Sequence, residues 1–203
     1  MNAVPEKSEQ VQETIAFHGH WCPGLAIGIR AAQWALKEMG KSPDEEIVAV
    51  VETDMCGVDA IQYILSCTFG KGNLIHRDYG KNAFTFYRRR DNKAARLVAR
   101  PDLYGEVGPA FRNLMRKMQQ EGLTKEEEKS IKDFRERMKR HIMEADFASL
   151  FEIKTPKEPV PQKARILSSL TCASCGESAM ESRTRHFKDQ ILCIPCFEEA
   201  ERR

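Results

Sequence analysis

The chain has 203 residues, with 32 Lys and Arg against 30 Asp and Glu, which gives a formal net charge of +2. This length suffices for one main hydrophobic core and a small second module, and the balanced charge excludes a global field that attracts nucleic acid or anionic membranes. The longest apolar runs, such as 25–29 and 47–51, are far shorter than the roughly 20 residues of a membrane span.

Cysteine usage indicates the compartment. The chain has seven cysteines, an odd number, and four of them form two CxxC pairs. Such usage is typical of metal sites and not of a secreted disulfide framework. Residues 1–10 also lack the apolar segment of a signal peptide. We therefore expect a cytoplasmic protein that does not associate with membranes.

Apolar periodicity predicts an α+β first domain, a mixed sheet with flanking helices, over residues 1–154. Pro23 at the start and Gly40 at the end delimit the clearest helix, and the β-branched run 47–51 predicts a buried strand. Thr124 and Glu127 form a capping box for a long helix, whose charged remainder we interpret as a solvated face. The predicted helices are 8–17, 23–39, 57–67, 106–120 and 124–146, and the predicted strands are 46–52, 73–78, 83–90 and 94–100.

A proline-rich segment separates this domain from the C-terminal residues. Three prolines lie at positions 156, 159 and 161, which predicts a stiff, extended linker over 155–165. Residues 166–203 would then form the second domain.

The segment Phe17–Gly24 concentrates metal-binding groups at a turn, because His18, His20 and Cys22 lie within five residues. Imidazole and thiolate are ligands that Zn²⁺ and similar metals prefer. An extended segment would place all three side chains on one face, whereas a helix would bring together only His18 and Cys22. Gly19 and Pro23 favour a helix end and a new start. The alternative is a helical corner with two incidental histidines.

A second constellation follows the strand 46–52. Asp54 and Cys56 precede the helix 57–67, at the carboxyl end of a strand, where α/β folds bind ligands. The helix dipole should lower the pKa of Cys56. We predict a core site with His18, His20, Cys22 and Cys56 as metal ligands, and with Cys56, His18 and Asp54 as candidate catalytic residues.

Two further residues of this constellation, Asp59 and Gln62, lie one turn apart and are predicted to orient a ligand from behind the metal site. Helix capping is the alternative role for both Asp54 and Asp59. Cys67 is predicted to be an inert core thiol, and His76 and His141 bystanders. The segment 68–73 lacks the spacing of a phosphate-binding loop, and 77–81 either carries charges near the core pocket or forms a strand-end turn.

The C-terminal cysteines form the pattern of a tetrahedral zinc site. Cys172 and Cys175 are followed, after seventeen residues, by Cys193 and Cys196, and this spacing predicts structural Zn²⁺ bound by four thiolates. The second pair leads into a helical run, where thiolates are favoured, so a small treble-clef-like finger is expected. Residues 162–203 carry seven basic and six acidic side chains, which makes nucleic acid an unlikely ligand.

These motifs together resemble the FmdE family, named after a component of formylmethanofuran dehydrogenase, a molybdenum or tungsten enzyme of one-carbon metabolism. The resemblance rests on Phe17–Gly24, on Asp54–Gln62, and on the segment from Thr68 through Asp78–Lys81, in matching order over residues 10–150. It implies an α+β core, a homodimer and a metal site built from the His/Cys cluster. Some members of the family also carry an appended four-cysteine finger. The resemblance does not imply methanogenesis.

Two functional hypotheses follow. The first is a metal-binding accessory or catalytic subunit that works with a molybdenum or tungsten oxidoreductase, with a second divalent metal of unknown identity in the core. The second is a metal or cofactor carrier, or a regulator whose finger binds a protein or nucleic-acid partner. The sequence contains no dinucleotide loop, P-loop or iron–sulfur cysteine run. We therefore expect a redox-linked accessory subunit that needs a cofactor or subunit from elsewhere, and an enzyme in its own right is the alternative.

Overall fold

The computed structural model describes residues 8–41, 44 and 46–202. The chain divides into two compact units, 1–163 and 164–203, which are described separately. The predicted linker straddles this division, and most of it belongs to the first unit.

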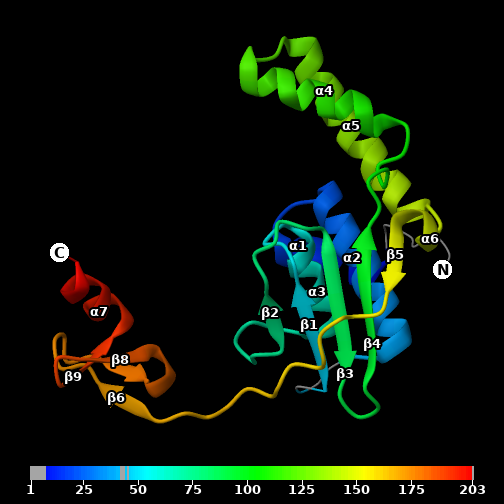
Figure 1. Cartoon of the computed structure of the whole chain (residues 1–203). Coiled ribbons are helices and arrows are strands. Elements are labelled where there is room, and N and C mark those ends of the chain that lie inside the picture. Colours follow the sequence, from blue (N-terminus) through cyan, green and yellow to red (C-terminus); the bar gives the residue numbers. More distant parts are fainter. Residues whose placement is uncertain (1–7, 42–43, 45, 203) are drawn as a thin grey trace. The chain divides into compact units, whose positions relative to one another are not determined.

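A five-stranded mixed sheet organises the first unit, in the order β2-β1-β3-β4-β5 (Figure 1). β1 pairs in parallel with β2, and the other neighbours are antiparallel. The strands are β1 (Ile47–Val51), β2 (Leu74–His76), β3 (Ala83–Arg88), β4 (Lys93–Ala99) and β5 (Phe151–Lys154).

Helices α1 (Glu9–His18), α2 (Pro23–Met39) and α3 (Gly57–Leu65) cover one face of this sheet (Figure 1). Alternate residues of β1 point into the core between the two layers, as Ile47, Ala49 and Val51 do, because side chains alternate between the faces of a strand. Arg30 of α2 is completely buried and donates hydrogen bonds to the carbonyls of Met143 and Ala145. These bonds tie α2 to the end of helix α5 (Lys125–Glu144).

The extended segment after β5 runs along the other face of the sheet (Figure 1). The Tyr87 hydroxyl donates a hydrogen bond of 3.1 Å to the carbonyl of Glu158, and Arg89 donates one of 2.6 Å to the carbonyl of Pro161. This contact explains why the polar residues Glu52, Thr85 and Tyr87 are buried there.

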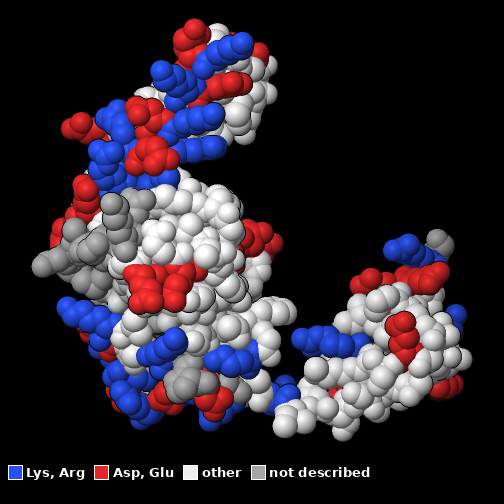
Figure 2. Space-filling view, turned by 180° about the vertical axis from the view of Figure 1, so that it is seen from behind, with Lys and Arg blue, Asp and Glu red and all other residues white. Residues whose placement is uncertain are grey.

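Helices α4 (Val107–Gln120) and α5 (Lys125–Glu144) form a hairpin that projects from the sheet (Figure 1). The predicted capping box is present, with Thr124 and Glu127 bonded reciprocally. Lys and Arg side chains alternate with Asp and Glu along this hairpin (Figure 2), as expected of a solvated helix surface. The part of α5 near its C-terminal end packs on α2, through buried residues such as Ile142.

Helix α6 (Phe147–Leu150) and strand β5 were not predicted from the sequence. The other predicted helices and strands of the first unit are present, and their ends either coincide with the predicted ones or are shifted by at most two residues. The segment 68–73 is a structural loop, because the buried Asn73 side chain bonds the Thr68 amide and the Ile47 carbonyl. The hydrophobic core and the sheet thus confirm the predicted α+β class.

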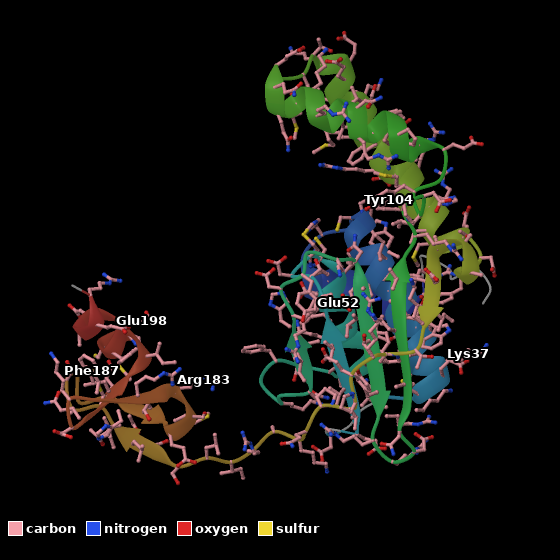
Figure 3. All side chains as sticks on the ribbon, in the orientation of Figure 1. Lys37, Glu52, Tyr104, Arg183, Phe187 and Glu198 are labelled. Atoms are coloured by element: carbon pink, nitrogen blue, oxygen red, sulfur yellow. The ribbon has the colours of Figure 1, made fainter. Side chains whose placement is uncertain are left out.

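The second unit consists of two short hairpins and a helix. β6 (Ser169–Thr171) pairs with β7 (Ser178–Met180), and β8 (Thr184–Phe187) pairs with β9 (Gln190–Cys193). The 3₁₀ turn η1 (Glu181–Arg183) joins the hairpins, and α7 (Ile194–Glu201) follows β9. The hydrophobic centre of the second unit is small. Leu192 and two of the cysteines are buried, and the Phe187 ring (Figure 3) packs edge-on against Phe197.

Among the described residues, no helix is both long enough and apolar enough to cross a membrane.

Candidate metal centre

The ends of three helices supply the core cluster. His18 is the last residue of α1, and Gly19 ends that helix with a φ of 90°, a left-handed conformation that favours glycine. Cys22 caps the N-terminus of α2, where its sulfur accepts a hydrogen bond from the Leu25 amide. Cys56 precedes the first turn of α3. The predicted bent segment between two helices is therefore present.

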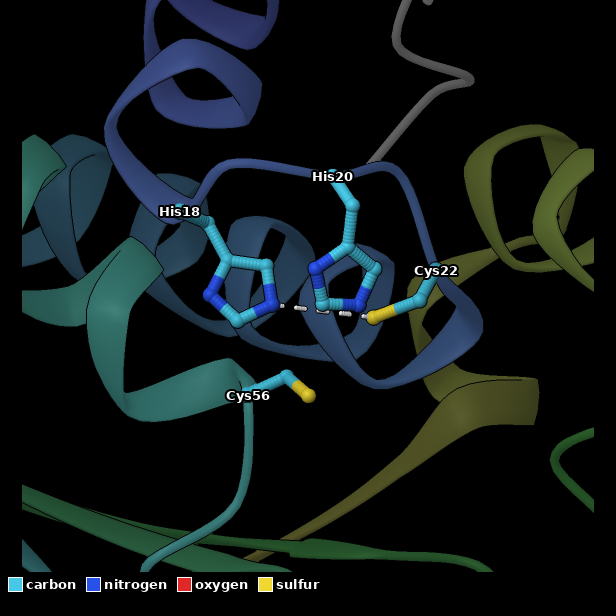
Figure 4. A group of neighbouring side chains, drawn as sticks. All are labelled: His18, His20, Cys22 and Cys56. Carbon is cyan, nitrogen blue, oxygen red and sulfur yellow. Dashed lines mark hydrogen bonds between the residues drawn. The ribbon is translucent and has the colours of Figure 1, made fainter.

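His18, His20, Cys22 and Cys56 converge on one point (Figure 4). One potential ligand atom from each residue lies within 4.8 Å of all the others. The His18 Nε2 atom lies 4.0 Å from the Cys22 sulfur, and the two imidazole rings are 4.4 Å apart between centroids. His20 is exposed, whereas the other three side chains are partly buried.

Close packing of glycines brings Cys56 to this point. A Cβ atom on Gly28 of α2 would lie 2.2 Å from the Gly57 carbonyl oxygen, and one on Gly24 would lie 3.3 Å from the Cys56 Cβ. The backbones of α2 and α3 therefore touch where the cluster forms. Sequence reasoning missed this contact, although the Gly24-x-x-x-Gly28 spacing is a signal for close helix approach.

A carboxylate orients His18 from behind the cluster. The His18 Nδ1 atom lies 2.7 Å from an Asp59 oxygen, and the Gln62 amide donates a hydrogen bond of 3.3 Å to the other Asp59 oxygen. When Nδ1 carries the proton toward Asp59, Nε2 is the nitrogen left to bind a metal, as in carboxylate–histidine–metal arrangements. Asp59 and Gln62 thus lie behind His18, and their predicted role in orienting a ligand stays a prediction.

The thiol of Cys56 differs from the expectation of a helix dipole. Burial, and next the nearby Cys22 sulfur, raise the pKa of the Cys56 thiol above its ordinary value. The predicted lowering was wrong because desolvation and a second sulfur disfavour the thiolate more than a helix N-terminus favours it. A divalent cation bound between the two sulfurs would reverse this effect.

The donor set fits zinc. Two sulfurs and two imidazole nitrogens are the ligands of many tetrahedral Zn²⁺ sites, and the 4.8 Å limit lets them close on one ion with small movements. Asp54 is exposed and lies outside this set, on the wall of the neighbouring pocket. Cys67 is also outside it: the thiol is buried, bonds the Ile47 carbonyl, and has its pKa raised to about 12 by burial.

A pocket of about 440 Å³ opens beside the cluster. His18, Cys56 and Asp59 form part of its wall, and Phe69 and Met55, both largely exposed, add apolar surface. His76, predicted to be a bystander, also lines this pocket. The pocket gives a small molecule access to His18 and Cys56, two of the four side chains that would hold the metal.

The second unit holds a separate cluster of the four predicted cysteines, Cys172, Cys175, Cys193 and Cys196, whose sulfurs lie within 4.8 Å of one another. The Cys172 sulfur accepts a hydrogen bond from the Cys193 amide, and backbone N–H groups lower its pKa to about 6. The hydrogen bond that the Cys196 thiol shares with the Cys193 sulfur instead raises the pKa of Cys196 to about 12, so the helix start does not favour every thiolate. Gly176 makes the turn after the first pair with a φ of 75°.

Comparison with known proteins supports both units. Residues 17–152 match the model described as "FmdE, Molybdenum formylmethanofuran dehydrogenase operon", and residues 165–202 match the prokaryotic dksA/traR C4-type zinc finger. The crystal structure of a tungsten formylmethanofuran dehydrogenase FmdE-like protein from Syntrophus aciditrophicus shares the fold, with a TM-score of 0.63, 23% identity and coverage of 100% of both chains.

A curated relative from Archaeoglobus fulgidus, named a probable S-adenosyl-L-methionine-binding protein, is 31% identical over 191 residues. The alignment covers 89% of this chain but only 50% of the relative, so the chain spans about half of that protein's length. Because the family model covers most of the chain and includes every residue of the core cluster, this protein belongs to the FmdE family and carries a C4-type zinc finger at its C-terminal end.

Proposed function

We propose that the core cluster binds a divalent metal, with Zn²⁺ as the best fit, and that the protein acts as an accessory subunit in one-carbon redox chemistry. The observation that carries this proposal is the convergence of four soft and borderline donors within 4.8 Å, with His18 oriented by Asp59. Metal sites of this type are seldom built without a metal to hold.

The cluster suits ligand binding better than a purely structural role because its four donors differ in their exposure to solvent. Cys22, Cys56 and His18 are partly buried, whereas His20 is exposed. A site in which all four donors bind is closed to substrate. Release of His20 would free one position for a ligand that enters through the 440 Å³ pocket. A bound metal would supply Lewis-acid chemistry there, while the chain's own residues orient the ligand and exclude water.

The metal content of the whole protein tests the proposal. The purified chain should contain about two zinc equivalents, one for the finger and one for the core. His18→Ala should reduce the content to about one equivalent, and the matched variant His76→Ala, in the same pocket but outside the ligand set, should keep about two. Two equivalents in His18→Ala would contradict the core metal.

The accessory role rests on the family and on the absence of an electron-transfer cofactor motif in the sequence. We expect the purified chain to show no turnover in formyl-group oxidation with artificial acceptors, and to co-purify with molybdenum or tungsten oxidoreductase subunits. Sustained turnover by the chain alone, lost in Cys56→Ala, would make it an enzyme in its own right. A carrier would instead release its core metal readily to a chelator. Thiolate ligands favour a reducing, cytoplasmic location.

A second candidate is the binding of a cationic sulfonium ligand such as S-adenosylmethionine in the same pocket. The described residues that line this pocket include the carboxylates of Asp54 and Asp59 but no lysine or arginine. A pocket of this charge favours a cation, and Phe69 and Met55 offer apolar surface for an adenine ring. The Archaeoglobus relative's name points to the same ligand.

Calorimetry with two ligands that differ in one charge tests this candidate. S-adenosylmethionine carries the sulfonium charge and S-adenosylhomocysteine lacks it, so electrostatic selection predicts at least about tenfold tighter binding of the former. Asp54→Asn should reduce that preference. Equal affinities for the two ligands, or no binding of either, would contradict the binding of a sulfonium ligand in this pocket.

We also propose that the α4–α5 hairpin pairs two copies of the chain. Phe111, Leu114 and Met115 of α4 are only partly buried, and Met118 is 43% exposed, so the projecting hairpin carries apolar surface that its own chain does not cover. Light scattering should show a dimer, and Met118→Glu should weaken it. The control Arg116→Glu changes an exposed residue that is already charged. A monomer at high protein concentration would contradict the pairing.

A further inference from the structure

A second pocket lies on the face of the sheet that the helices do not cover. Its volume is about 310 Å³, within the size range of small-molecule sites. The sheet contributes Glu52, Thr85 and Tyr87 to its floor, and the segment that follows β5 contributes Lys157 and Glu158 to its wall. Figure 3 labels Glu52 at the end of β1. No residue of this pocket belongs to the core metal cluster.

The charges of this pocket are not balanced. Five of its lining residues are lysine or arginine, and two are glutamate. Both glutamates are already paired: Arg96 binds Glu52 through two hydrogen bonds of 2.6 and 2.7 Å, and Arg77 lies 3.6 Å from Glu158. Within the part of the chain that the structure describes, neither Lys81 nor Lys157 has an ion-pair partner. The pocket therefore keeps an excess of positive charge that its own acidic residues do not neutralise.

The two unpaired ammonium groups come from different segments. Lys81 follows β2 by five residues and Lys157 follows β5 by three, yet both line one cavity. Both side chains are exposed, and an anion bound in the cavity would be attracted by both charges. The buried floor strengthens this attraction, because Glu52, Thr85 and Tyr87 are each no more than 6% exposed and exclude water from one side.

Aromatic rings supply the rest of the surface. Tyr79 and Tyr87 both line the pocket, and the Lys81 ammonium lies 5.7 Å from the centre of the Tyr79 ring. Tyrosine rings bind planar groups by stacking, and a neighbouring cation places a charge beside the stacked group. A ligand with a doubly charged anionic group and a planar body matches both features.

From this charge excess and this aromatic wall we propose that the pocket is a binding site for a small organic phosphate, separate from the metal centre. The phosphate would lie between Lys81 and Lys157, and the planar body against the exposed ring of Tyr79. The charges of 77–81 were expected either near the core pocket or in a strand-end turn, but Arg77, Tyr79 and Lys81 line this second pocket and not the core pocket. The ligand would also link the sheet to the segment that leads to the finger.

Calorimetry on the full-length protein with AMP as the probe tests this site. AMP should bind with an affinity that falls as the salt concentration rises, and adenosine, which lacks the phosphate, should bind at least tenfold more weakly. Ribose 5-phosphate, which lacks the base, should also bind more weakly than AMP. Adenosine binding as tightly as AMP, or no AMP binding up to millimolar concentration, would overturn the proposal.

Variants locate the binding. The double variant Lys81→Gln with Lys157→Gln should weaken AMP binding at least tenfold, whereas Lys129→Gln, the same change on the exposed surface of α5, should leave it unchanged. His18→Ala should also leave it unchanged, because the proposed site does not depend on the core metal. An unaltered affinity in the double variant, or a loss in His18→Ala, would refute the assignment.

Limited proteolysis gives an independent readout. The bond after Lys157 lies in the pocket wall and is a trypsin site, so saturating AMP should slow cleavage there several-fold. Cleavage after Lys129 provides the internal reference. Equal rates at Lys157 with and without AMP would show that the ligand does not contact this segment.

Discussion

The core cluster and the finger both gather four ligand atoms within 4.8 Å, yet they are built in different ways. The finger takes its ligands from two CxxC pairs, one in the β6–β7 hairpin and one at the junction of β9 and α7. Its buried apolar centre is little more than Leu192, Cys172 and Cys193. The core cluster lies at the edge of a large hydrophobic core, and its helices are held by packing that involves no ligand. The finger therefore needs its metal in order to fold, whereas the core folds without a metal and holds the four ligand side chains in place.

The strongest test of this contrast is Cys193→Ser. A structural zinc contributes about 10–16 kcal/mol in small domains of this kind, so the variant should lose one zinc and unfold residues 164–203. The core has its own hydrophobic cluster and should keep its melting temperature. Zinc analysis together with hydrogen exchange resolves the two units, with Ser178→Ala as a control at an exposed finger residue that binds no metal. A core that melts together with the finger would show that the contrast is wrong.

A second variant disturbs the core site by changing the packing between α2 and α3. A methyl group added by Gly28→Ala would meet the Gly57 carbonyl oxygen at 2.2 Å, and because both partners are backbone, the helices must separate. Overpacking costs typically 1–3 kcal/mol, and a clash of this kind should reach about 3 kcal/mol or more. Urea unfolding should show this loss together with weaker core metal binding, while the finger keeps its zinc.

The matched control is Gly70→Ala, because a methyl group there meets nothing within 4 Å. Full core metal affinity in Gly28→Ala would mean that the α2–α3 contact does not position Cys56.

Local patterns were enough to predict the elements that carry the site. Pro23 and Gly40 defined α2 to the residue, and Thr124 with Glu127 predicted the start of α5. Both signals act within one helical turn, where a short sequence determines the geometry. The CxxC spacing likewise predicted the finger cysteines, because such knuckles are local turns.

Features that depend on distant contacts could not be predicted in this way. β5 has only four residues and exists because it pairs with β4, and the contact between Gly28 and Gly57 joins two helices. The direction of the Cys56 pKa shift also depends on burial and on the approach of Cys22, which a helix-start pattern does not contain. The proximity of His18 and Asp59 was anticipated only as a general second-layer role, without its 2.7 Å geometry.

Asp59→Asn tests the difference between the core site and the finger by changing a single hydrogen bond, the one between Asp59 and His18. Asp59 holds the His18 ring, and loss of such a partner typically reduces metal affinity 10- to 100-fold. The core should therefore release its metal at lower chelator concentration, while the finger, whose ligands are all cysteines, is unaffected. Asp54→Asn is the control, since Asp54 is exposed and outside the ligand cluster. If both variants behave alike, Asp59 does not orient His18.

The smallest expected effect concerns Cys67, the one core thiol that binds no metal in this scheme. Burial raises its pKa from 9.0 to about 12, so between these values the folded protein retains a proton that the unfolded chain loses. The unfolded state then binds fewer protons, and stability falls as pH rises above about 9. Between pH 8 and pH 10 this single thiol should lower the free energy of unfolding by about 1.4 kcal/mol. Cys67→Ala removes the group.

Wild type and Cys67→Ala are compared by urea unfolding at both pH values, and every other titrating group cancels in the difference. The wild type should lose about 1.4 kcal/mol more than the variant between pH 8 and pH 10. The core zinc content should be the same in both proteins, because Cys67 lies outside the ligand cluster. An equal pH dependence would mean that the Cys67 thiol titrates normally in the folded state, and a lost core zinc would mean that the cluster has a different set of sulfur ligands.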